Sequence, residues 1–245
     1  MTTLAVIPAR WQSTRFPGKP LAQIGGREMI ARVWDQVVQA HSIDRTVVAT
    51  DSDRIASFCE ANRMDVVMTK GDHPTGSDRL AEVAEKIPAD IYVNVQGDEP
   101  LIEPASINAV STCLSAVVRR GIEVSTGYIK VASDDQLDNP SVVHLVPALD
   151  GTVITFSRFP VPYPQGETMQ RTVHVGLYAF TGAALAKYAD WERGPVEKSE
   201  SVEILRFLEH GERVACVPVP AGSIGVDTPE DIARVEAVLA DRGEL

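Results

Sequence analysis

The chain has 245 residues, a length that is enough to bury a core in one large or two small domains. Its residues are 44% hydrophobic and 23% charged, which is ordinary for a globular protein. Its 34 acidic residues outnumber its 23 basic ones, and the formal net charge of -11 argues against nonspecific binding to nucleic acid or to anionic membranes. The sequence shows no apolar run long enough for membrane insertion and no signal peptide, so we expect a cytoplasmic protein. Cys59, Cys113 and Cys216 are widely spaced and predict reduced, packed thiols.

The first predicted element is a buried strand over residues 4–7, followed by a loop rich in small and basic residues and by a helical pattern over residues 28–40. Open α/β sheets bind ligands at the carboxyl ends of their strands, which is where this order places the loop. The loop carries Arg10, Arg15 and Lys19, and three cations within about ten residues suit a triphosphate. It is not a Walker A loop, because Ser13 stands where the first glycine belongs, and the chain has no G-x-G-x-x-G fingerprint.

Further strands are predicted at residues 46–49, 66–68 and 91–95, with helices over 55–61 and 78–86, which Ser77 is expected to cap. Strands that alternate with helices indicate a mostly parallel sheet. The strand at 91–95 ends in Gln96-Gly-Asp98-Glu99-Pro. A carboxylate at this edge of the sheet, facing a triphosphate, predicts a magnesium ligand at Asp98, whereas Glu99 is either a second ligand or a solvated rim charge.

After a helical stretch at 107–118, four strand-like runs at 124–131, 142–146, 153–156 and 173–180 predict antiparallel pairing. An amphipathic helix over 197–211, a strand at 214–217 and a terminal helix capped by Thr228 follow. The predicted fold class is therefore α/β, with a mostly parallel central sheet and an appended antiparallel lobe. We expect residues 1–120 and 212–245 to form the α/β core and residues 121–211 the smaller lobe.

Several of these segments together carry a family resemblance. Pro8 begins P-A-R-x-x-S-T-R-x-P-G-K-P-L, Gln96 begins Q-G-D-E-P and Gly225 begins G-V-D-T-P-E-D. The chain thereby resembles the sugar nucleotidyltransferases, and among them the CMP-Kdo synthetase (3-deoxy-manno-octulosonate cytidylyltransferase) family. The resemblance implies a Rossmann-like nucleotidyltransferase fold and a homodimer formed through the smaller lobe. It also implies transfer of CMP from CTP to an acidic acceptor, by default Kdo, with release of pyrophosphate.

The resemblance also implies roles for individual residues. Catalysis is expected from Arg10, Arg15, Lys19 and Asp98, and Mg²⁺ is expected between Asp98 and Asp227. The nucleotide is expected to contact Ala9, Arg10, Ser13, Arg15, Lys19, Asp72, Gly76, Ser77, Arg79 and Gln96. The motifs F-S-R-x-x-[IV]-P and H-x-G-x-Y imply that the acceptor meets Arg158, His174 and Tyr178, and the family pattern E-x-L-E-Q-L-R adds Glu200 and Glu203. In a regular strand His174 and Tyr178 share one face, and on the predicted helix Glu200 and Glu203 also share a face, where a merely solvated acidic surface is the alternative.

Two departures from the family pattern fall in the half of the chain expected to bind the acceptor. Ile204 stands where the family has Gln, and His144 stands where it commonly has Lys. A hydroxyl-rich sugar that lost such contacts would bind less well. A smaller acid, such as a phosphonate of the phosphonoformate type from natural-product biosynthesis, therefore stays an alternative acceptor. A non-catalytic nucleotide-binding relative is an alternative of another class, and it would be expected to lack Lys19 or a metal carboxylate.

Overall fold

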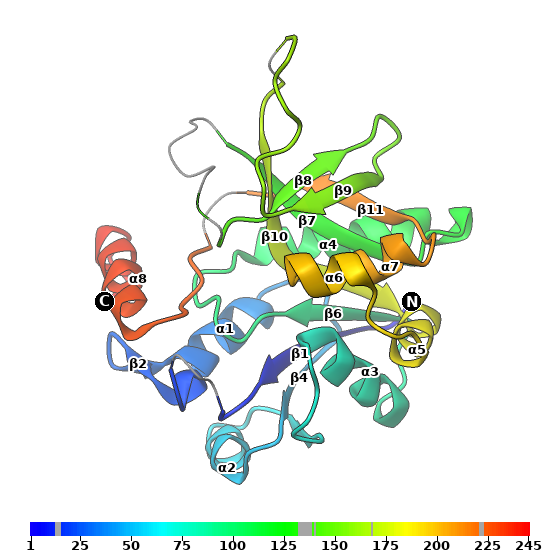
Figure 1. Ribbon diagram of the computed structural model, residues 1–245. Coiled ribbons are helices and arrows are strands. Elements are labelled where there is room, and N and C mark those ends of the chain that lie inside the picture. The colour runs from blue at the N-terminus through cyan, green and yellow to red at the C-terminus, as the bar shows by residue number, and fades with distance from the viewer. Residues whose placement is uncertain (13–15, 132–138, 140, 168, 221–222) are drawn as a thin grey trace.

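The computed structural model describes residues 1–12, 16–131, 139, 141–167, 169–220 and 223–245, and Ser13 and Arg15 lie outside this range. Within these residues nine strands form one sheet covered by helices on both faces (Figure 1). The strand order is β11-β7-β10-β6-β1-β4-β5, and the hairpin of β8 and β9 joins the sheet at β10. The expected α/β class is confirmed.

The parallel half of the sheet comes from the first hundred residues. It consists of β1 (Thr3–Ala9), β4 (Arg45–Thr50), β5 (Val66–Met68) and β6 (Ile91–Val95). These strands pair in parallel, and α1 (Met29–Val37), α2 (Asp53–Ala61) and α3 (Gly76–Lys86) connect them. The predicted strands at the start of the chain are confirmed to within a few residues.

The other half holds β7 (Val124–Lys130), β8 (His144–Pro147), β9 (Val153–Ser157), β10 (Thr172–Thr181) and β11 (Val214–Pro218). β10 runs antiparallel to β6 and β7, and β11 runs parallel to β7. The expected antiparallel strands are present, and β10 makes them continuous with the parallel half. The division into a core and a smaller lobe at residues 121 and 211 stays a prediction.

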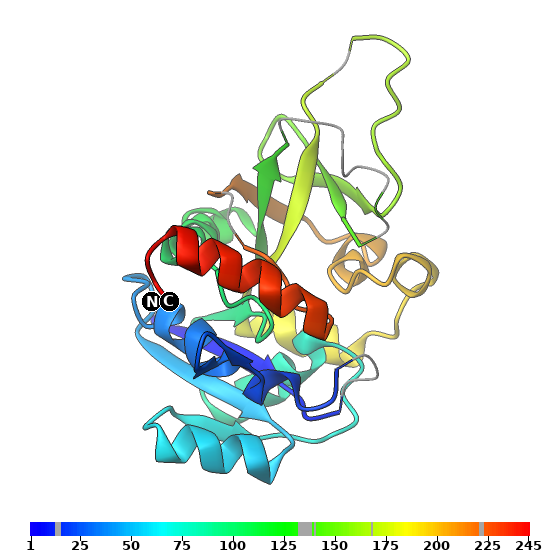
Figure 2. The same cartoon turned by 90° about the vertical axis from the view of Figure 1, so that its left-hand side faces the viewer.

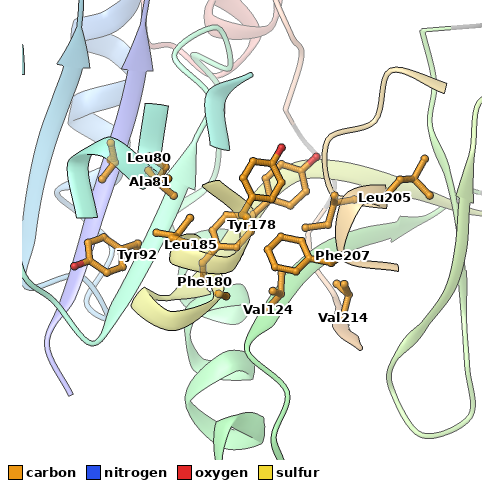
Figure 3. Packing of buried hydrophobic residues seen from close by; sticks show 14 of the residues in the cluster. Leu80, Ala81, Tyr92, Val124, Tyr178, Phe180, Leu185, Leu205, Phe207 and Val214 are labelled. Atoms are coloured by element: carbon orange, nitrogen blue, oxygen red, sulfur yellow. The ribbon is translucent and has the colours of Figure 1, made fainter. Parts of the chain in front are cut away.

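Alternating side chains along the strands build a core on each face of the sheet. From β1, Leu4 and Val6 join one cluster, which α3, α5 (Gly182–Asp190) and α7 (Leu205–Glu209) cover. Ala5 and Ile7 join the other cluster, which α1, α2 and α4 (Pro104–Val117) cover. Figure 3 shows Tyr178, Phe180 and Phe207 packed in the first cluster. Because both faces of the strand are buried, its sequence is a continuous apolar run.

The last helix, α8 (Pro229–Asp241), returns to the N-terminal part of the chain and lies beside it (Figure 2). Val235 and Leu239 of α8 pack with Ile24 from the small hairpin of β2 (Gln23–Ile24) and β3 (Arg27–Glu28). Thr228 and Asp231 form a capping box at its start, which confirms the predicted cap. Short 3₁₀ turns lie at Lys19–Leu21 and Val118–Arg120.

Two local predictions were wrong. The N-cap of α3 is Thr75, because Asp78 at its third position completes a capping box with that residue, and Ser77 lies inside the helix. The predicted helix over 197–211 is two helices, α6 (Pro195–Glu200) and α7, separated where Ser201 adopts a left-handed conformation with φ of 52°. Glu200 and Glu203 therefore do not share a helix face.

All three cysteines are free, with Cys59 and Cys216 buried and Cys113 half-buried. Burial raises the pKa of Cys59 to about 11, so its thiol stays protonated near neutral pH. No helix in the described part of the chain is long and apolar enough to cross a membrane.

Candidate active site

Two adjoining clefts open at the carboxyl ends of the parallel strands. The first encloses about 300 Å³ beside the ends of β1 and β6, and the second encloses about 690 Å³ beside β10. Pro74, Thr75, Gln96 and Asp227 line both clefts. A molecule in one cleft can therefore touch a molecule in the other.

The first cleft gathers most of the residues predicted to bind the nucleotide. Ala9, Arg10, Lys19, Gly76, Arg79, Gln96, Asp98 and Asp227 all line it. Asp72 is exposed and Ser77 is buried, and neither lines the cleft. His73, which was not among the predicted site residues, does line it.

Close backbone packing brings the walls of the first cleft together. A Cβ on Gly97 would lie 2.7 Å from the carbonyl oxygen of Pro8, so only glycine permits this approach between the ends of β6 and β1. A Cβ on Gly76 would lie 3.3 Å from Nδ2 of Asn94. Gly76 is the first residue of α3, so the positive end of that helix faces the cleft and favours an anion there.

Lys19 is held between the two aspartates that were predicted to bind metal. Its Nζ donates a hydrogen bond of 2.6 Å to Oδ2 of Asp98 and one of 2.8 Å to the carbonyl oxygen of Val226. Oδ1 of Asp227 lies 3.6 Å from the same nitrogen. The turn before Lys19 depends on Gly18, which has a φ of 71° and packs so closely on Trp11 that a Cβ would lie 3.1 Å from its ring. The structure thus brings Asp98 and Asp227 to one point.

These two carboxylates suit Mg²⁺ better than a metal held by protein ligands alone. The residues that the structure describes contain no group of three or more His, Cys, Asp or Glu side chains that could hold a metal ion. Mg²⁺ is commonly held by one or two carboxylates together with phosphate oxygens and water. Asp98 and Asp227 fit that donor set, provided that the nucleotide supplies the phosphates.

In the first cleft, Arg79 and His73 each lie beside a carboxylate that holds the side chain in place. Arg79 is buried, contacts the hydroxyl of Thr69 and lies 3.7 Å from Oδ2 of Asp51. Nε2 of His73 lies 2.5 Å from Oε2 of Glu82. Burial alone would raise the pKa of Glu82. Hydrogen bonds from Lys86, from the Lys70 backbone and from His73 outweigh that effect and lower the pKa to about 2. Glu82 is therefore ionised and orients His73.

In the second cleft, Arg158 is anchored to the end of α6. The backbone N–H of Arg158 donates to Oε2 of Glu200 at 2.7 Å, and its Nε donates to the carbonyl oxygen of Glu200 at 2.6 Å. The other carboxylate oxygen of Glu200 accepts from Oγ of Ser157 at 2.9 Å. Arg158 lines the cleft and Glu200 does not, so in the structure Glu200 positions Arg158.

His174 and Tyr178 lie on the same face of β10, as predicted, although the pairing with β7 shifts between Val175 and Tyr178. Their ring centroids are 5.2 Å apart, and both line the second cleft. The hydroxyl of Thr126 donates to the carbonyl oxygen of Leu177, so it must accept a hydrogen bond from Nε2 of His174 at 3.0 Å. Burial lowers the pKa of His174 to about 3, which keeps the imidazole neutral.

Glu203 links the second cleft to the first. Its Oε2 accepts a hydrogen bond of 3.0 Å from the backbone N–H of Ser77, in the first turn of α3. Burial raises the pKa of Glu203, and the same effect raises the pKa of Tyr178 beside it. Among the lining residues of this cleft that the sequence did not indicate are Glu99, Arg193 and Ser223. Glu99 is not a solvated rim charge, because it accepts a hydrogen bond from Ser223 and burial raises its pKa to about 7.

The two departures from the family pattern lie in the interior. Ile204 is fully buried in the cluster that α7 covers, and His144 is fully buried on β8. Neither lines the second cleft. In this chain, therefore, neither side chain contributes a polar group to the wall of this cleft, and the effect of the two departures on acceptor binding stays a prediction.

A family model described as cytidylyltransferase matches residues 4–214. The chain belongs to the cytidylyltransferase family. A 3-deoxy-manno-octulosonate cytidylyltransferase from Syntrophotalea carbinolica is 43% identical and covers 98% of this chain and 99% of its own length. One from Myxococcus xanthus is also 43% identical, with 98% of each chain covered.

A solved structure of CMP:2-keto-3-deoxy-manno-octonic acid synthetase complexed with CTP superposes on this cytidylyltransferase with a TM-score of 0.92. It is 36% identical and covers 99% of this chain and all of its own. A cytidylyltransferase from Leptospira borgpetersenii, 18% identical with a TM-score of 0.67, shares the fold. The chain is thus a CTP-dependent nucleotidyltransferase.

Proposed function

We propose that this cytidylyltransferase transfers CMP from CTP to 3-deoxy-manno-octulosonate (Kdo) and releases pyrophosphate. An acceptor hydroxyl loses its proton to water, and its oxygen forms a bond to the α-phosphorus of CTP. The bond from that phosphorus to the bridging oxygen breaks, and pyrophosphate leaves with its electron pair. The observation that carries this proposal is the common wall of the two clefts, since Gln96 and Asp227 line both of them. Two substrates that must react directly can meet there.

In this proposal the first cleft binds CTP. Arg10 and Lys19 bind the triphosphate, and Lys19 exchanges its contact with Asp98 for phosphate oxygens when the nucleotide enters. The N-terminal turn of α3, with Gly76, adds backbone donors, and Arg79 adds a buried positive charge. Ser13 and Arg15 remain proposed nucleotide contacts that lie outside the described residues.

Asp98 and Asp227 would hold Mg²⁺ at the junction of the clefts. The ion would supply charge stabilisation to the phosphate oxygens as pyrophosphate leaves. Asp227 is well placed for this role because it lines both clefts. Its backbone is held in place, since its N–H donates a hydrogen bond of 3.0 Å to Oδ2 of Asp231.

The second cleft would bind the acceptor. The positively charged guanidinium of Arg158 is proposed to pair with the carboxylate of the acceptor. His174, Tyr178 and Glu203 offer one neutral imidazole, one hydroxyl and one carboxyl group to acceptor hydroxyls. Glu200 is proposed to act on the acceptor only through Arg158.

Pyrophosphate release in the presence of CTP and Mg²⁺ tests the proposal. We expect turnover when 3-deoxy-manno-octulosonate is added and at least a 100-fold lower rate without an acceptor. We expect Arg158→Gln to raise the KM for the acid and leave the KM for CTP within twofold. Absence of turnover with every acid tried would overturn the proposed function.

A cytoplasmic homodimer is also proposed. The three free thiols suit a reducing compartment. Ile154 on β9, and Phe159 and Tyr163 in the segment between β9 and β10, are large exposed apolar side chains of the kind that protein interfaces cover. That segment projects from the sheet (Figure 1). Light scattering coupled to size-exclusion chromatography tests the proposed dimer, and we expect a mass of twice 26.5 kDa.

A further inference from the structure

The second cleft contains a second arginine that the proposed acceptor does not require. Arg193 lines the cleft together with Arg158, and it precedes α6. Its Nε donates a hydrogen bond of 3.0 Å to Oε1 of Glu197, which is fully buried. Among the described residues its two Nη groups have no partner, and its side chain is 35% exposed. A guanidinium fixed at Nε and open at both Nη atoms is arranged to bind an anion.

Both arginines are fixed to one short helix. Arg193 is held by the side chain of Glu197, and Arg158 is held by the backbone carbonyl of Glu200. These two positions are three residues apart on α6, which corresponds to about 4.5 Å along the helix axis. The two guanidinium groups are therefore held by residues less than one turn apart on the same helix, and both side chains line the second cleft.

Glu197 is itself held in place, which makes Arg193 a rigid part of the cleft. Arg206 of α7 donates to both carboxylate oxygens of Glu197 at 2.8 Å, and its Nη1 donates to Asp78 at 3.1 Å. Arg206 also stacks over the ring of Tyr188, with 3.7 Å to the centroid. The buried cluster of Arg206, Glu197 and Asp78 thus fixes the carboxylate on which Arg193 depends.

We propose that Arg193 forms a second anion subsite in the acceptor cleft, so that a second anionic group on a bound acid, such as a phosphonate beside its carboxylate, strengthens its binding. Arg158 would bind one group and Arg193 the other. The inference rests on the proposed function in that an acidic acceptor occupies this cleft. It differs in the number of acidic groups recognised, because 3-deoxy-manno-octulosonate carries a single carboxylate.

Calorimetric titration with two matched ligands tests the subsite. Phosphonoformate and its carboxylate methyl ester are nearly equal in size and differ by one acidic group. Saturating α,β-methylene CTP and Mg²⁺ occupy the first cleft, so that neither ligand binds in place of pyrophosphate. We expect the wild type to bind phosphonoformate at least 10-fold more tightly than the ester.

The variants then assign that preference to a residue. Arg193→Gln is expected to weaken phosphonoformate binding at least 10-fold and ester binding less than twofold, whereas Arg193→Lys keeps part of the preference. Arg213→Gln is the matched control, because Arg213 is about half exposed and pairs with Asp150 outside both clefts. Equal affinities of the wild type for the two ligands, or an unchanged preference in Arg193→Gln, would overturn the inference.

The calorimetric test of the Arg193 subsite and the pyrophosphate-release test of the proposed reaction can fail independently. If pyrophosphate release fails with every acid but the calorimetric preference depends on Arg193, the subsite stands and the proposed reaction does not. If the enzyme turns over 3-deoxy-manno-octulosonate and Arg193→Gln changes neither affinity, the reaction stands and the subsite is refuted.

Discussion

Lys19 donates a hydrogen bond of 2.6 Å from Nζ to Oδ2 of Asp98, a residue 79 positions later in the chain. Both residues line the first cleft, and Oδ1 of Asp227 lies 3.6 Å from the same nitrogen. In this arrangement the lysine occupies the position between two carboxylates that a divalent cation would take. In the proposed reaction, Lys19 therefore moves from the two carboxylates toward the phosphates when nucleotide and metal bind.

The first prediction concerns Asp98. Asp98→Asn keeps the size of the side chain and removes its charge, and we expect kcat/KM for CTP to fall by about 10² to 10³ because a metal carboxylate is lost. The melting temperature without ligand should change little, since Asp98 is partly exposed. Asp65→Asn, on an exposed residue far from the clefts, is the control. Normal turnover in Asp98→Asn would remove the metal assignment.

The second prediction concerns Gly97. Gly97→Ala places a Cβ 2.7 Å from the carbonyl oxygen of Pro8, so β1 and β6 must separate at the wall of the nucleotide cleft. We expect a loss of about 1 to 3 kcal/mol in unfolding free energy and a higher KM for CTP. Denaturant titration and steady-state kinetics measure the two effects. Gly166→Ala should change neither, because a Cβ there meets nothing within 4 Å.

The third prediction concerns pH and His174. Burial lowers the pKa of His174 to about 3, so below about pH 6.5 the unfolded chain binds a proton that the folded chain does not. Stability is therefore fully present above pH 6.5 and is lost as the pH falls toward 3. When the pH falls from 7 to 4, proton binding by this residue in the unfolded chain should lower the free energy of unfolding by on the order of 2 to 3 kcal/mol.

His174→Phe isolates that contribution. The ring volume stays, the hydrogen bond to Thr126 is lost, and the unfolding free energy at pH 7 should drop by about 1 kcal/mol. Its dependence on pH between 4 and 7 should become shallower than in the wild type. His41→Gln, on an exposed histidine, should leave the pH dependence unchanged. Parallel pH profiles for His174→Phe and the wild type would contradict the assignment.

The fourth prediction concerns Ile204. Its side chain is fully buried among apolar neighbours, so Ile204→Gln buries an amide in the core, and we expect a loss of about 2 to 4 kcal/mol. Ile204→Val should cost only about 1 kcal/mol. Because Ile204 does not line the acceptor cleft, neither variant should change the KM for an acid once the protein is folded. A lower KM for 3-deoxy-manno-octulosonate in Ile204→Gln would show that this position reaches the acceptor.

Much of the fold was predictable because hydrophobic period and turn chemistry agreed along the chain. The apolar runs at 4–7 and 91–95 became β1 and β6, and the cap at Thr228 was read correctly. The break at Ser201 was not predicted, because a left-handed serine within an amphipathic pattern has no local sequence signal. The cap of α3 was misassigned because both Thr75 and Ser77 can cap and only Asp78 distinguishes them.

For the site, residues that end neighbouring strands were predicted best. Asp98 and Gln96 follow β6 directly, and topology alone places them at the cleft. Arg193 was missed because its role depends on Glu197 and on the short helix α6, neither of which the sequence pattern separates from a solvated acidic helix. The places of Ile204 and His144 could not be inferred from a pattern, because which side of an irregular segment faces the core depends on tertiary packing.

The contact of Lys19 with the carbonyl of Val226 spans 207 positions. During synthesis, the chain must therefore emerge from the ribosome at least as far as Val226 before this contact can form. Proteins dominated by such distant contacts pay loop-closure entropy before the contacts form, which slows folding. Loss of the last twenty residues would remove Val226 and Asp227 along with α8, so a prematurely terminated chain would bring neither of them to Lys19.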